Sequence, residues 1–394
     1  MLKFRWETKF QKTEIGEISR EWELKKLGDI LEIRYGKGLP EKERKDGEIP
    51  VLGSSGLIGY HNKHFAKGPG LIIGRKGNIG GVYFSKTDFF PIDTVFYSEK
   101  VQNALFLYYT ISKIDLQQLM SDSAVPGLNI NFLKSVKIPL PPPPEQSRIA
   151  TVLSWFDDLI ENKKRQNEIM EKTAMAIFKS WFVDFEPFQN EEFVYSEELG
   201  REIPKGWEVK KVGAIFKLIK GRKCTVVNKP QNGALPYLLI ESFKTGEELW
   251  TLDKINHLYI VSEEDIVFVA DGESSGKIFR YKYGILGSTL LYLHVKNPDD
   301  SLYIRNFTYL FLKFHEEDIM SHRTGSAIPH LDKSYLQNFS ILLPPFLILQ
   351  RFHELVEPMF KKIILNQKEI MILRKARDAL LPKLVFGKIR VVEI

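Results

Sequence analysis

The stretch that decides the fold is PPPPEQSRIATVLSWFDDLIENKKRQNEIMEKTAMAIFKSWF, residues 141–182. Its four prolines predict an extended segment, and Glu145 and Gln146 follow in a first helical turn, where the helix dipole favours acidic side chains. The next residues recur at alternating steps of four and three, which is the seam of a helix that packs on another helix. This seam consists of Ile149, Leu153, Phe156, Ile160, Lys163, Asn167, Met170, Ala174, Ile177 and Trp181. We expect a helix from 145 to about 182, whose seam spans roughly 50 Å and which acts as a spacer.

A second copy of this seam lies 203 residues later. It consists of Phe352, Val356, Met359, Ile363, Asn366, Ile370, Leu373, Arg377, Leu380 and Leu384. The second helix should begin after Pro345 and end near Leu381, because Pro382 cannot continue it. Pro358 should kink this helix or mark its true start.

The segments that precede the two helices also repeat. Ser123–Asn129 corresponds to Ser326–Asp332 at the same offset of 203 residues. Further upstream, Trp22–Gly28 corresponds to Trp207–Gly213 at an offset of 185. The two offsets differ by 18, so the second copy holds 18 extra residues. The pattern predicts a duplicated scaffold with one variable interior.

The composition is that of an ordinary globular protein, with 43% hydrophobic and 27% charged residues in 394. The single cysteine, Cys224, excludes an internal disulfide framework and fits a reducing cytoplasm. No apolar run approaches membrane-spanning length, and the first five residues lack a signal-peptide core, so we expect a soluble, cytoplasmic protein with no membrane partner. A net charge of +6 permits nucleic-acid binding without requiring it.

Short strands separated by glycine-rich turns are predicted in both halves. They are Ile30–Tyr35, Ile49–Leu52, Leu71–Ile73, Val82–Phe84 and Thr94–Tyr97 in the first half, and Tyr237–Ile240, Ile266–Ala270, Ile278–Tyr281 and Thr289–Val295 in the second. Amphipathic segments at Leu105–Met120 and Tyr303–Met320 add helices. Residues 1–20 are expected to form a polar arm against the first half.

The fold class is therefore α+β, with two similar domains of mixed or antiparallel sheets. Each long helix leaves one domain toward the other, so the chain order predicts two antiparallel coiled-coil helices in a pseudo-twofold arrangement. In that arrangement Lys163 and Asn366, which lie near the two helix midpoints, should be close together.

Motifs for catalysis are weak or missing. Gly272–Lys277 resembles a phosphate-binding loop, but it has three residues between its glycines instead of four, and Ile278 stands where Ser or Thr should hold magnesium. His61 and His64 have no partner at metal-binding spacing. The sequence has no Asn-Pro-Pro-aromatic run, which an adenine methyltransferase needs. We expect no catalytic residue, no cofactor and no metal site in this chain.

Loop residues differ between the two copies where the scaffold is the same. Gly74–Asn78 is GRKGN, and at an offset of 195 Val269–Glu273 is VADGE. Arginine and lysine suit guanine edges or phosphates, asparagine suits adenine, and aspartate or glutamate can accept from cytosine. The DNA-binding candidates in these loops are Arg75, Lys76, Asn78, Asp271 and Glu273. Two domains with the same scaffold and different polar loop residues would recognise two different short sequences. The alternative for any single loop is a solvated turn.

Basic residues also lie beside a glycine in both copies, as expected for phosphate contacts that position a protein on DNA. These candidates are Arg34, Lys37, Lys220, Arg222 and Lys223, and Lys277 and Arg323 complete the set.

These features together resemble the specificity subunits of type I restriction-modification systems. The resemblance rests on Trp-Glu-x-Lys-Lys-x-Gly opening each half, the Gly-Arg-Lys-Gly loop, Ile138–Pro144 running into Glu145-Gln146, and Lys179–Phe185 closing the first helix. It covers the whole chain. The sequence departs from the family in the second helix, where Phe346–Gln350 replace the proline-glutamate-glutamine start.

The resemblance implies two target-recognition domains, residues 1–144 and 184–345, that recognise the halves of a bipartite, asymmetric site in double-stranded DNA. Spacer helices 145–183 and 346–394, the latter with a C-terminal tail, would fix the gap and dock two modification subunits. The expected helix-pairing residues are Ile149, Leu153, Phe156, Ile160, Met170, Ile177, Trp181, Phe352, Val356, Met359, Ile363, Ile370, Leu373 and Leu380. S-adenosylmethionine, ATP and Mg would belong to the modification and restriction subunits.

Two other hypotheses come from different classes. A self-contained methyltransferase or nuclease would need the catalytic motifs that are missing. A pure scaffold fits the long helices but leaves the basic, divergent loops unexplained.

Overall fold

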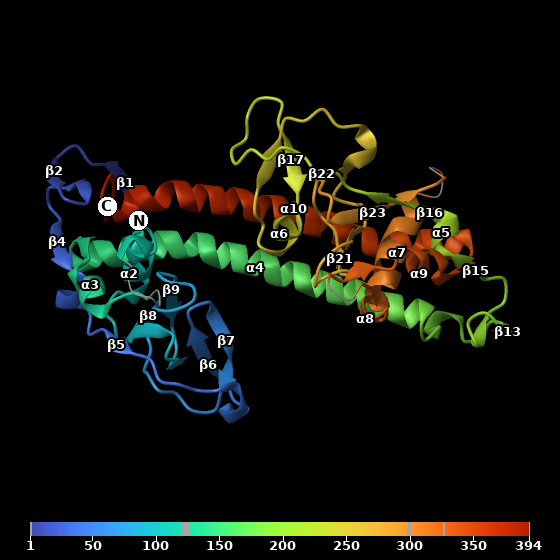
Figure 1. Ribbon diagram of the computed structural model, residues 1–394, viewed down its shortest axis with the longest axis horizontal. Coiled ribbons are helices and arrows are strands. Elements are labelled where there is room, and N and C mark those ends of the chain that lie inside the picture. Colours follow the sequence, from blue (N-terminus) through green and yellow to red (C-terminus); the bar gives the residue numbers. More distant parts are fainter. Residues whose placement is uncertain (1, 120–126, 298–300, 326–327, 394) are drawn as a thin grey trace. The chain divides into compact units, whose positions relative to one another are not determined.

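The computed structural model describes residues 2–119, 127–297, 301–325 and 328–393 (Figure 1). The chain divides into two compact units, which are residues 1–161 with 371–394 (unit 1) and residues 162–370 (unit 2). Each unit contains a set of sheets and one part of each of two long helices. The four domain limits expected from the sequence stay a prediction.

Unit 1 is built on a four-stranded antiparallel sheet in the order β5-β11-β8-β9. These strands are Arg34–Tyr35 (β5), Val95–Ser98 (β11), Gly70–Gly74 (β8) and Val82–Ser85 (β9). A second sheet has the order β10-β6-β7 and contains Phe90–Pro91 (β10), Ile49–Gly53 (β6) and Gly56–His61 (β7), with β10 parallel to β6. The remaining elements are Glu23–Lys26 (β4), paired with Lys137–Leu140 (β12), the helices Leu27–Ile30 (α1), Ala104–Ile111 (α2) and Ile130–Ser135 (α3), and the 3-10 turns Glu41–Glu43 (η1) and Leu116–Leu119 (η2).

Unit 2 repeats this plan. Its four-stranded antiparallel sheet has the order β16-β23-β20-β21, with Phe216–Lys220 (β16), Leu290–Val295 (β23), Val267–Val269 (β20) and Ile278–Phe279 (β21). Its second sheet has the order β18-β17-β22-β19, with Leu249–Thr251 (β18), Leu235–Leu238 (β17), Gly284–Leu286 (β22) and Ile260–Val261 (β19), and β17 is parallel to β22. The other strands are Phe193–Ser196 (β13) with Arg201–Pro204 (β14), Glu208–Lys211 (β15) with Ser340–Leu343 (β26), and Arg323–Thr324 (β24) with His330–Leu331 (β25). The helices are Val212–Ile215 (α5), Ile240–Lys244 (α6), Ser301–Phe314 (α7), Glu316–Ser321 (α8) and Lys333–Asn338 (α9), with 3-10 turns Glu186–Phe188 (η3) and His257–Tyr259 (η4).

Backbone hydrogen bonds confirm the predicted repeat within each unit. The Leu27 amide donates to the Val136 carbonyl at 2.8 Å, and the Val212 amide donates to the Phe339 carbonyl at 2.9 Å. The two donors, Leu27 and Val212, are 185 residues apart, and the two acceptors, Val136 and Phe339, are 203 residues apart. These are the two offsets predicted from the sequence. Asn129 and Asp332, which are also related by 203, cap α3 and α9 through their side-chain oxygens.

The extra residues of the second copy lie in two places. The offset between matched residues is 185 at Gly36, 195 at Thr94 and 203 at Leu128. Ten of the 18 extra residues therefore precede Thr289, and eight follow it. The first insertion contains α6, which follows β17 where β6 of unit 1 turns directly into β7.

The two long helices are Pro143–Phe182 (α4) and Phe346–Val385 (α10), each of 40 residues. In unit 1 Arg377 donates to Asp157 at 2.6 Å. In unit 2 Asn366 donates to Asn167 at 2.8 Å, and Lys163 forms an ion pair with Glu369. Partner numbers fall along α10 as they rise along α4, so the predicted antiparallel pairing is confirmed and the two midpoints meet.

The structure places every expected helix-pairing residue on a buried or half-buried face. The buried ones are Ile149, Leu153, Ile160, Phe352, Val356, Ile363 and Ile370, and the half-buried ones are Phe156, Met170, Ile177, Trp181, Met359, Leu373 and Leu380.

Two expectations about proline were wrong, and one was confirmed. α4 begins at Pro143, two residues early, because proline has no amide hydrogen to lose in a first helical turn and its φ is already helical. α10 begins at Phe346, directly after Pro345 as predicted, so of the two alternatives for Pro358 the one in which it marks the start is excluded. α10 also continues through Pro382 to Val385, because Leu384 and Val385 are fully buried and their burial offsets one missing hydrogen bond.

The chain ends also differ from expectation. Leu2–Trp6 (β1) is not an arm but pairs antiparallel with Ile389–Glu393 (β27), and Phe10–Thr13 (β2) pairs with Gly16–Ser19 (β3). Ile30 ends α1 instead of starting a strand. The predicted amphipathic segments each divide in two, into α2 and η2 in unit 1 and into α7 and α8 in unit 2. Met120, Ser123–Pro126 and Ser326–Ala327 lie outside the described residues.

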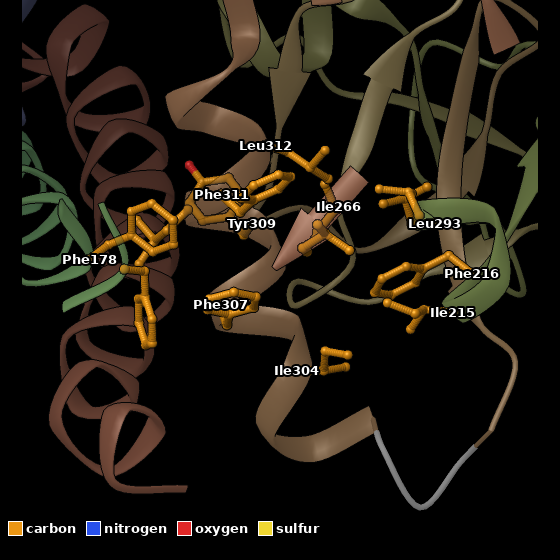
Figure 2. Packing of buried hydrophobic residues seen from close by; sticks show 14 of the residues in the cluster. Phe178, Ile215, Phe216, Ile266, Leu293, Ile304, Phe307, Tyr309, Phe311 and Leu312 are labelled. Atoms are coloured by element: carbon orange, nitrogen blue, oxygen red, sulfur yellow. The ribbon is translucent and has the colours of Figure 1, made fainter. Parts of the chain in front are cut away.

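The core of unit 2 joins α4 and α10 to the sheet domain through aromatic side chains. The Phe182 ring lies 4.8 Å from the centroids of both Phe307 on α7 and Phe352 on α10. Figure 2 shows Phe178 beside the long helices, Phe307 on α7 and Phe216 at the sheet, as successive members of one cluster. Each sheet domain is therefore anchored on its part of the helix pair by a continuous apolar cluster.

Candidate nucleic-acid interface

Two loops present the divergent side chains, and they share one backbone frame. We call residues 74–81 the first tip and residues 269–277 the second tip. In the first tip the Thr94 carbonyl accepts from the amides of Arg75 at 2.9 Å and Lys76 at 3.2 Å. In the second, the Thr289 carbonyl accepts from Ala270 at 2.8 Å and Asp271 at 3.3 Å. The offset of 195 predicted from the sequence is thus confirmed.

Each tip is closed in the same way from the segment before α3 or α9. The Leu128 amide donates to the Arg75 carbonyl at 3.0 Å, and the Leu331 amide donates to the Ala270 carbonyl at 2.9 Å. Gly77 and Gly272 have φ of +73° and +105°, a backbone conformation that favours glycine. The frame is therefore conserved while the side chains on it are not.

Basic residues flank a glycine that cannot be replaced. A Cβ at Gly36 would lie 2.0 Å from the Ile92 carbonyl oxygen, and one at Gly221 would lie 2.3 Å from that of Gly287. Lys37 follows Gly36, and Arg222 and Lys223 follow Gly221, all three exposed. Close backbone approach thus holds these turns beside the tips.

Two of the three candidate side chains of the first tip make contacts within the protein. Arg75 is half-buried, with its guanidinium 5.2 Å from the Tyr35 ring and 5.9 Å from the Phe96 ring. Asn78 donates to the Tyr83 hydroxyl at 3.1 Å. Lys76 and Asn78 are both exposed, although Asn78 is held by Tyr83. Of these three, Arg75 is therefore the side chain that packs against the protein.

Arg34 and Lys37 lie on or beside β5. Arg34 forms ion pairs with Glu32 at 2.8 Å and Glu99 at 2.6 Å. The hydrogen bond that Arg34 donates to Glu32 raises the pKa of Arg34 above its ordinary value. The Lys37 ammonium lies 5.5 Å from the Phe65 ring. Lys37 is therefore the better placed of the two for a phosphate.

The second tip brings together residues from three segments. Asp271 accepts from Lys220 at 2.8 Å through one oxygen and lies 2.8 Å from the Nδ1 of His330 through the other. Burial raises the pKa of Asp271, but the hydrogen bonds from Lys220 and His330 outweigh it, and the net pKa is lowered. We call Lys220, Asp271 and His330 the second-tip triad.

The other candidates of unit 2 lie around this triad. Arg323 donates to the Glu273 carbonyl at 2.7 Å, which joins β24 to the second tip. The Glu273 side chain is exposed and Lys277 is half-buried. The Arg222 guanidinium lies 4.5 Å from the Tyr259 ring. Lys223 is exposed on the turn after β16.

His330 is a residue that sequence reasoning missed. It follows Pro329 in the repeated segment, at the position of Gly127 in the first copy. A histidine that replaces glycine in an otherwise repeated segment is the signal that could have identified it.

In the described ranges, no group of three or more His, Cys, Asp or Glu side chains is arranged to hold a metal ion. None of the helices that the structure describes is long and apolar enough to cross a bilayer.

Comparison with known proteins identifies relatives along the whole chain. The sequence matches the family described as "Type I restriction modification DNA specificity domain" over residues 19–171 and again over residues 204–373. It is 38% identical to the type I restriction enzyme MjaIX specificity subunit of Methanocaldococcus jannaschii, over 100% of this chain and 99% of that protein. It is 24% identical to the type I restriction enzyme HindI specificity subunit of Haemophilus influenzae, over 67% of this chain and 71% of that protein.

A solved structure shows the same fold. The S subunit of a type I restriction-modification system from M. genitalium superimposes with a TM-score of 0.57 at 19% identity, over 92% of this chain and 96% of that one.

Proposed function

Because the chain belongs to the family of type I restriction-modification DNA specificity subunits, we propose that it recognises a bipartite, asymmetric DNA site through its two tips. One half of the site would meet the first tip and the other half the second. The chain would thereby direct a modification and restriction complex to that site without performing the chemistry.

The observation that carries this proposal is that the two tips share the same backbone hydrogen bonds but have different side chains at matched positions. In both tips two backbone amides donate to a threonine carbonyl, that of Thr94 or Thr289. In both, a leucine amide donates to a carbonyl of the tip. On that frame Lys76 of the first tip corresponds to Asp271 of the second, and Asn78 corresponds to Glu273. A basic side chain is thus exchanged for an acidic one at a matched position, which alters the hydrogen-bonding groups offered to base edges.

Phosphate contacts would hold each tip in register. Lys37, Arg222 and Lys223 lie next to the glycine turns that flank the tips. Contacts of lysine and arginine to phosphate position a protein on a duplex but carry no sequence information. These residues would supply affinity, while the tips would supply specificity.

The long helices would serve the complex in two ways. Two continuous helices of 40 residues could set the number of base pairs between the half-sites. Their outer faces carry exposed apolar side chains, among them Trp155, Ile169 and Ile372, that two modification subunits could cover. Those partners would bring S-adenosylmethionine-dependent adenine methylation, and a restriction subunit would bring ATP-driven, Mg-dependent cleavage.

The test is to map methylated adenines produced by modification subunits with and without this chain. We expect one bipartite sequence to be methylated with the chain present and none without it. Lys76→Ala should relax recognition of one half-site only, whereas Lys86→Ala, an exposed lysine beyond the opposite end of β9, should change neither.

Two results would contradict the proposal. One is sequence-specific methylation by modification subunits alone. The other is methylation of DNA by the isolated chain with S-adenosylmethionine, which would make it an enzyme in its own right.

A further inference from the structure

Each position of the second-tip triad has a matched position in the first copy. The residue types at all three matched positions are different. Lys220, Asp271 and His330 correspond to Tyr35, Lys76 and Gly127. In the first copy the Tyr35 ring lies against the guanidinium of Arg75, and in the second copy Lys220 and Ala270 occupy the matched positions. The two copies therefore exchange a set of interacting side chains rather than single residues.

The backbone holds the triad in place before any ligand arrives. Asp271 and His330 form an isolated antiparallel bridge, and the Gly272 amide donates to the Pro329 carbonyl at 2.9 Å. The side chains are 42% (Lys220), 25% (Asp271) and 47% (His330) exposed. Ion pairs that are this exposed add little to folding stability, so stability alone gives a weak reason for the arrangement.

Hydrogen-bond chemistry determines what the triad presents. A carboxylate can only accept, so the Nδ1 of His330 must carry the proton that it shares with Asp271. In the neutral imidazole the Nε2 is then an acceptor. The Lys220 ammonium has three N–H groups, of which one is used by Asp271, so donors are left for a ligand.

We propose that Asp271 recognises no base itself but is a positioning residue that holds Lys220 and His330 as a donor and acceptor pair for the major-groove edge of adenine. Adenine presents an N7 acceptor, which suits Lys220, next to an N6 amine donor, which suits the Nε2 of His330. Guanine presents two acceptors at the same places, and cytosine presents no N7. This inference rests on the proposed function and adds a base identity to it.

The inference also changes the role predicted for Asp271. The sequence alone suggested that its carboxylate accepts from cytosine. With both oxygens engaged by Lys220 and His330, the carboxylate instead orients the two side chains that would contact the base.

The experiment combines substitutions of single side chains with base analogues that lack single atoms or groups, and it measures binding. The full complex with modification subunits is bound to its duplex, in which each adenine of the second half-site is replaced in turn by 7-deazaadenine, which lacks N7, or by nebularine, which lacks the 6-amino group. At one adenine we expect each replacement to weaken binding by about 10-fold or more. Lys220→Met should abolish the 7-deaza effect at that adenine, and His330→Ala should abolish the nebularine effect.

Matched variants separate positioning from folding. Asp271→Asn should diminish both analogue effects. Its thermal unfolding midpoint should remain the same as that of the wild type. Lys76→Met, the corresponding position of the first tip, should leave both effects intact. Because an analogue cycle reports a contact to one base atom, a merely structural role for Lys220 or His330 would not produce the coupling.

The outcomes distinguish the two proposals. If the wild-type complex prefers no bipartite sequence, the proposed function and this inference both fail. If it does prefer one, but the analogue and protein changes are additive at every adenine, or guanine is preferred at the coupled position, only the assignment of the triad fails.

Discussion

At the scale of single residues, Arg390 joins three carboxylates of unit 1. Arg390 on β27 is 4% exposed and donates to Glu145 at 2.6 and 2.7 Å, to Glu7 at 2.8 Å and to Glu21 at 3.0 Å. Trp22 also donates to Glu145, at 3.3 Å. In the second copy Ile348 replaces Glu145, and the indole nitrogen of Trp207 is buried with no partner among the described residues. The network thus belongs to unit 1 alone.

Removing Arg390 should strongly destabilise unit 1. Arg390→Ala leaves buried carboxylates without their cation, which costs about 3–5 kcal/mol of unfolding free energy. Urea unfolding followed by tryptophan fluorescence would measure it. The control is Lys205→Ala, which removes a solvent-exposed ion pair with Glu192 and should cost at most about 1 kcal/mol. A loss in Arg390→Ala no larger than in the control would contradict the role of the network.

Acid should weaken the same network. Burial raises the pKa of Glu7, but hydrogen bonds from the Lys9 amide, Ser19 and Arg390 outweigh it and lower the pKa from 4.5 to about 2. A lowered folded-state pKa contributes stability that is fully present above 4.5 and is lost as the pH falls toward 2. We expect a loss of about 1–3 kcal/mol across that window, measured by urea unfolding at several pH values. Glu7→Gln should be less stable at neutral pH and should lose less on acidification.

At the scale of elements, the pairing of α4 and α10 combines an apolar seam with a polar centre. Asn366 is fully buried and donates to Asn167, which is 7% exposed, and the Asn366 side-chain oxygen lies among the buried atoms that have no partner in the described chain. A buried amide in a helix seam costs stability but restricts register, because any shift leaves it unpaired. The pair marks the point where the two helix midpoints meet.

A double-mutant cycle would test this centre. Asn366→Leu alone should cost about 1–3 kcal/mol, because Asn167 keeps a buried amide without its partner. Asn366→Leu with Asn167→Leu should recover that loss or exceed wild-type stability, because both amides are replaced by apolar groups. Denaturant unfolding measures each variant, with Lys172→Ala on the exposed face of α4 as the control. If the stability losses of the two single variants add up in the double variant, the two amides do not stabilise each other.

At the scale of the whole molecule, each unit carries one tip and one set of flanking basic turns. The two kinds of residue should have separable effects on DNA binding. Tip residues are expected to act at one half-site, while Lys37, Arg222 and Lys223 are expected to act on any sequence.

Lys223→Ala should weaken binding of the assembled complex to specific and non-specific DNA by a similar factor. The reason is the loss of one phosphate contact, which also lowers the slope of log binding constant against log salt concentration by about one. Titrations at several salt concentrations on both kinds of DNA measure the slope. Lys76→Ala is the matched comparison, and it should lower the affinity ratio between the two DNAs. A change of sequence preference in Lys223→Ala would contradict its assignment.

Much of the fold could be predicted because the relevant signals are local and occur twice. The seam of α4 repeats in α10, and the caps Asn129 and Asp332 repeat before α3 and α9. Failures occurred where distant contacts override local preference. Pro382 is helical because Leu384 and Val385 are buried, and the strand expected at Ile278–Tyr281 stops at Phe279, near Tyr281, whose φ is +73°.

The candidate site was predicted in outline but not in its contacts. Matched glycines located both tips, because Gly77 and Gly272 adopt positive φ values that favour glycine. Which side chains lie outward could not be predicted, since Arg75 rests on Tyr35 from another strand and Asp271 bonds to His330, 59 residues away.

By itself, then, the sequence determined the duplication, the helix pair, the α+β class and the loops where the copies differ. Periodicity, capping and glycine placement are properties of short segments, so they can be recognised without coordinates. Only the tertiary structure decided which charges are buried and what each polar side chain bonds to. The Arg390 network and the second-tip triad each join segments that are distant in the chain, and such contacts depend on how the strands and helices pack.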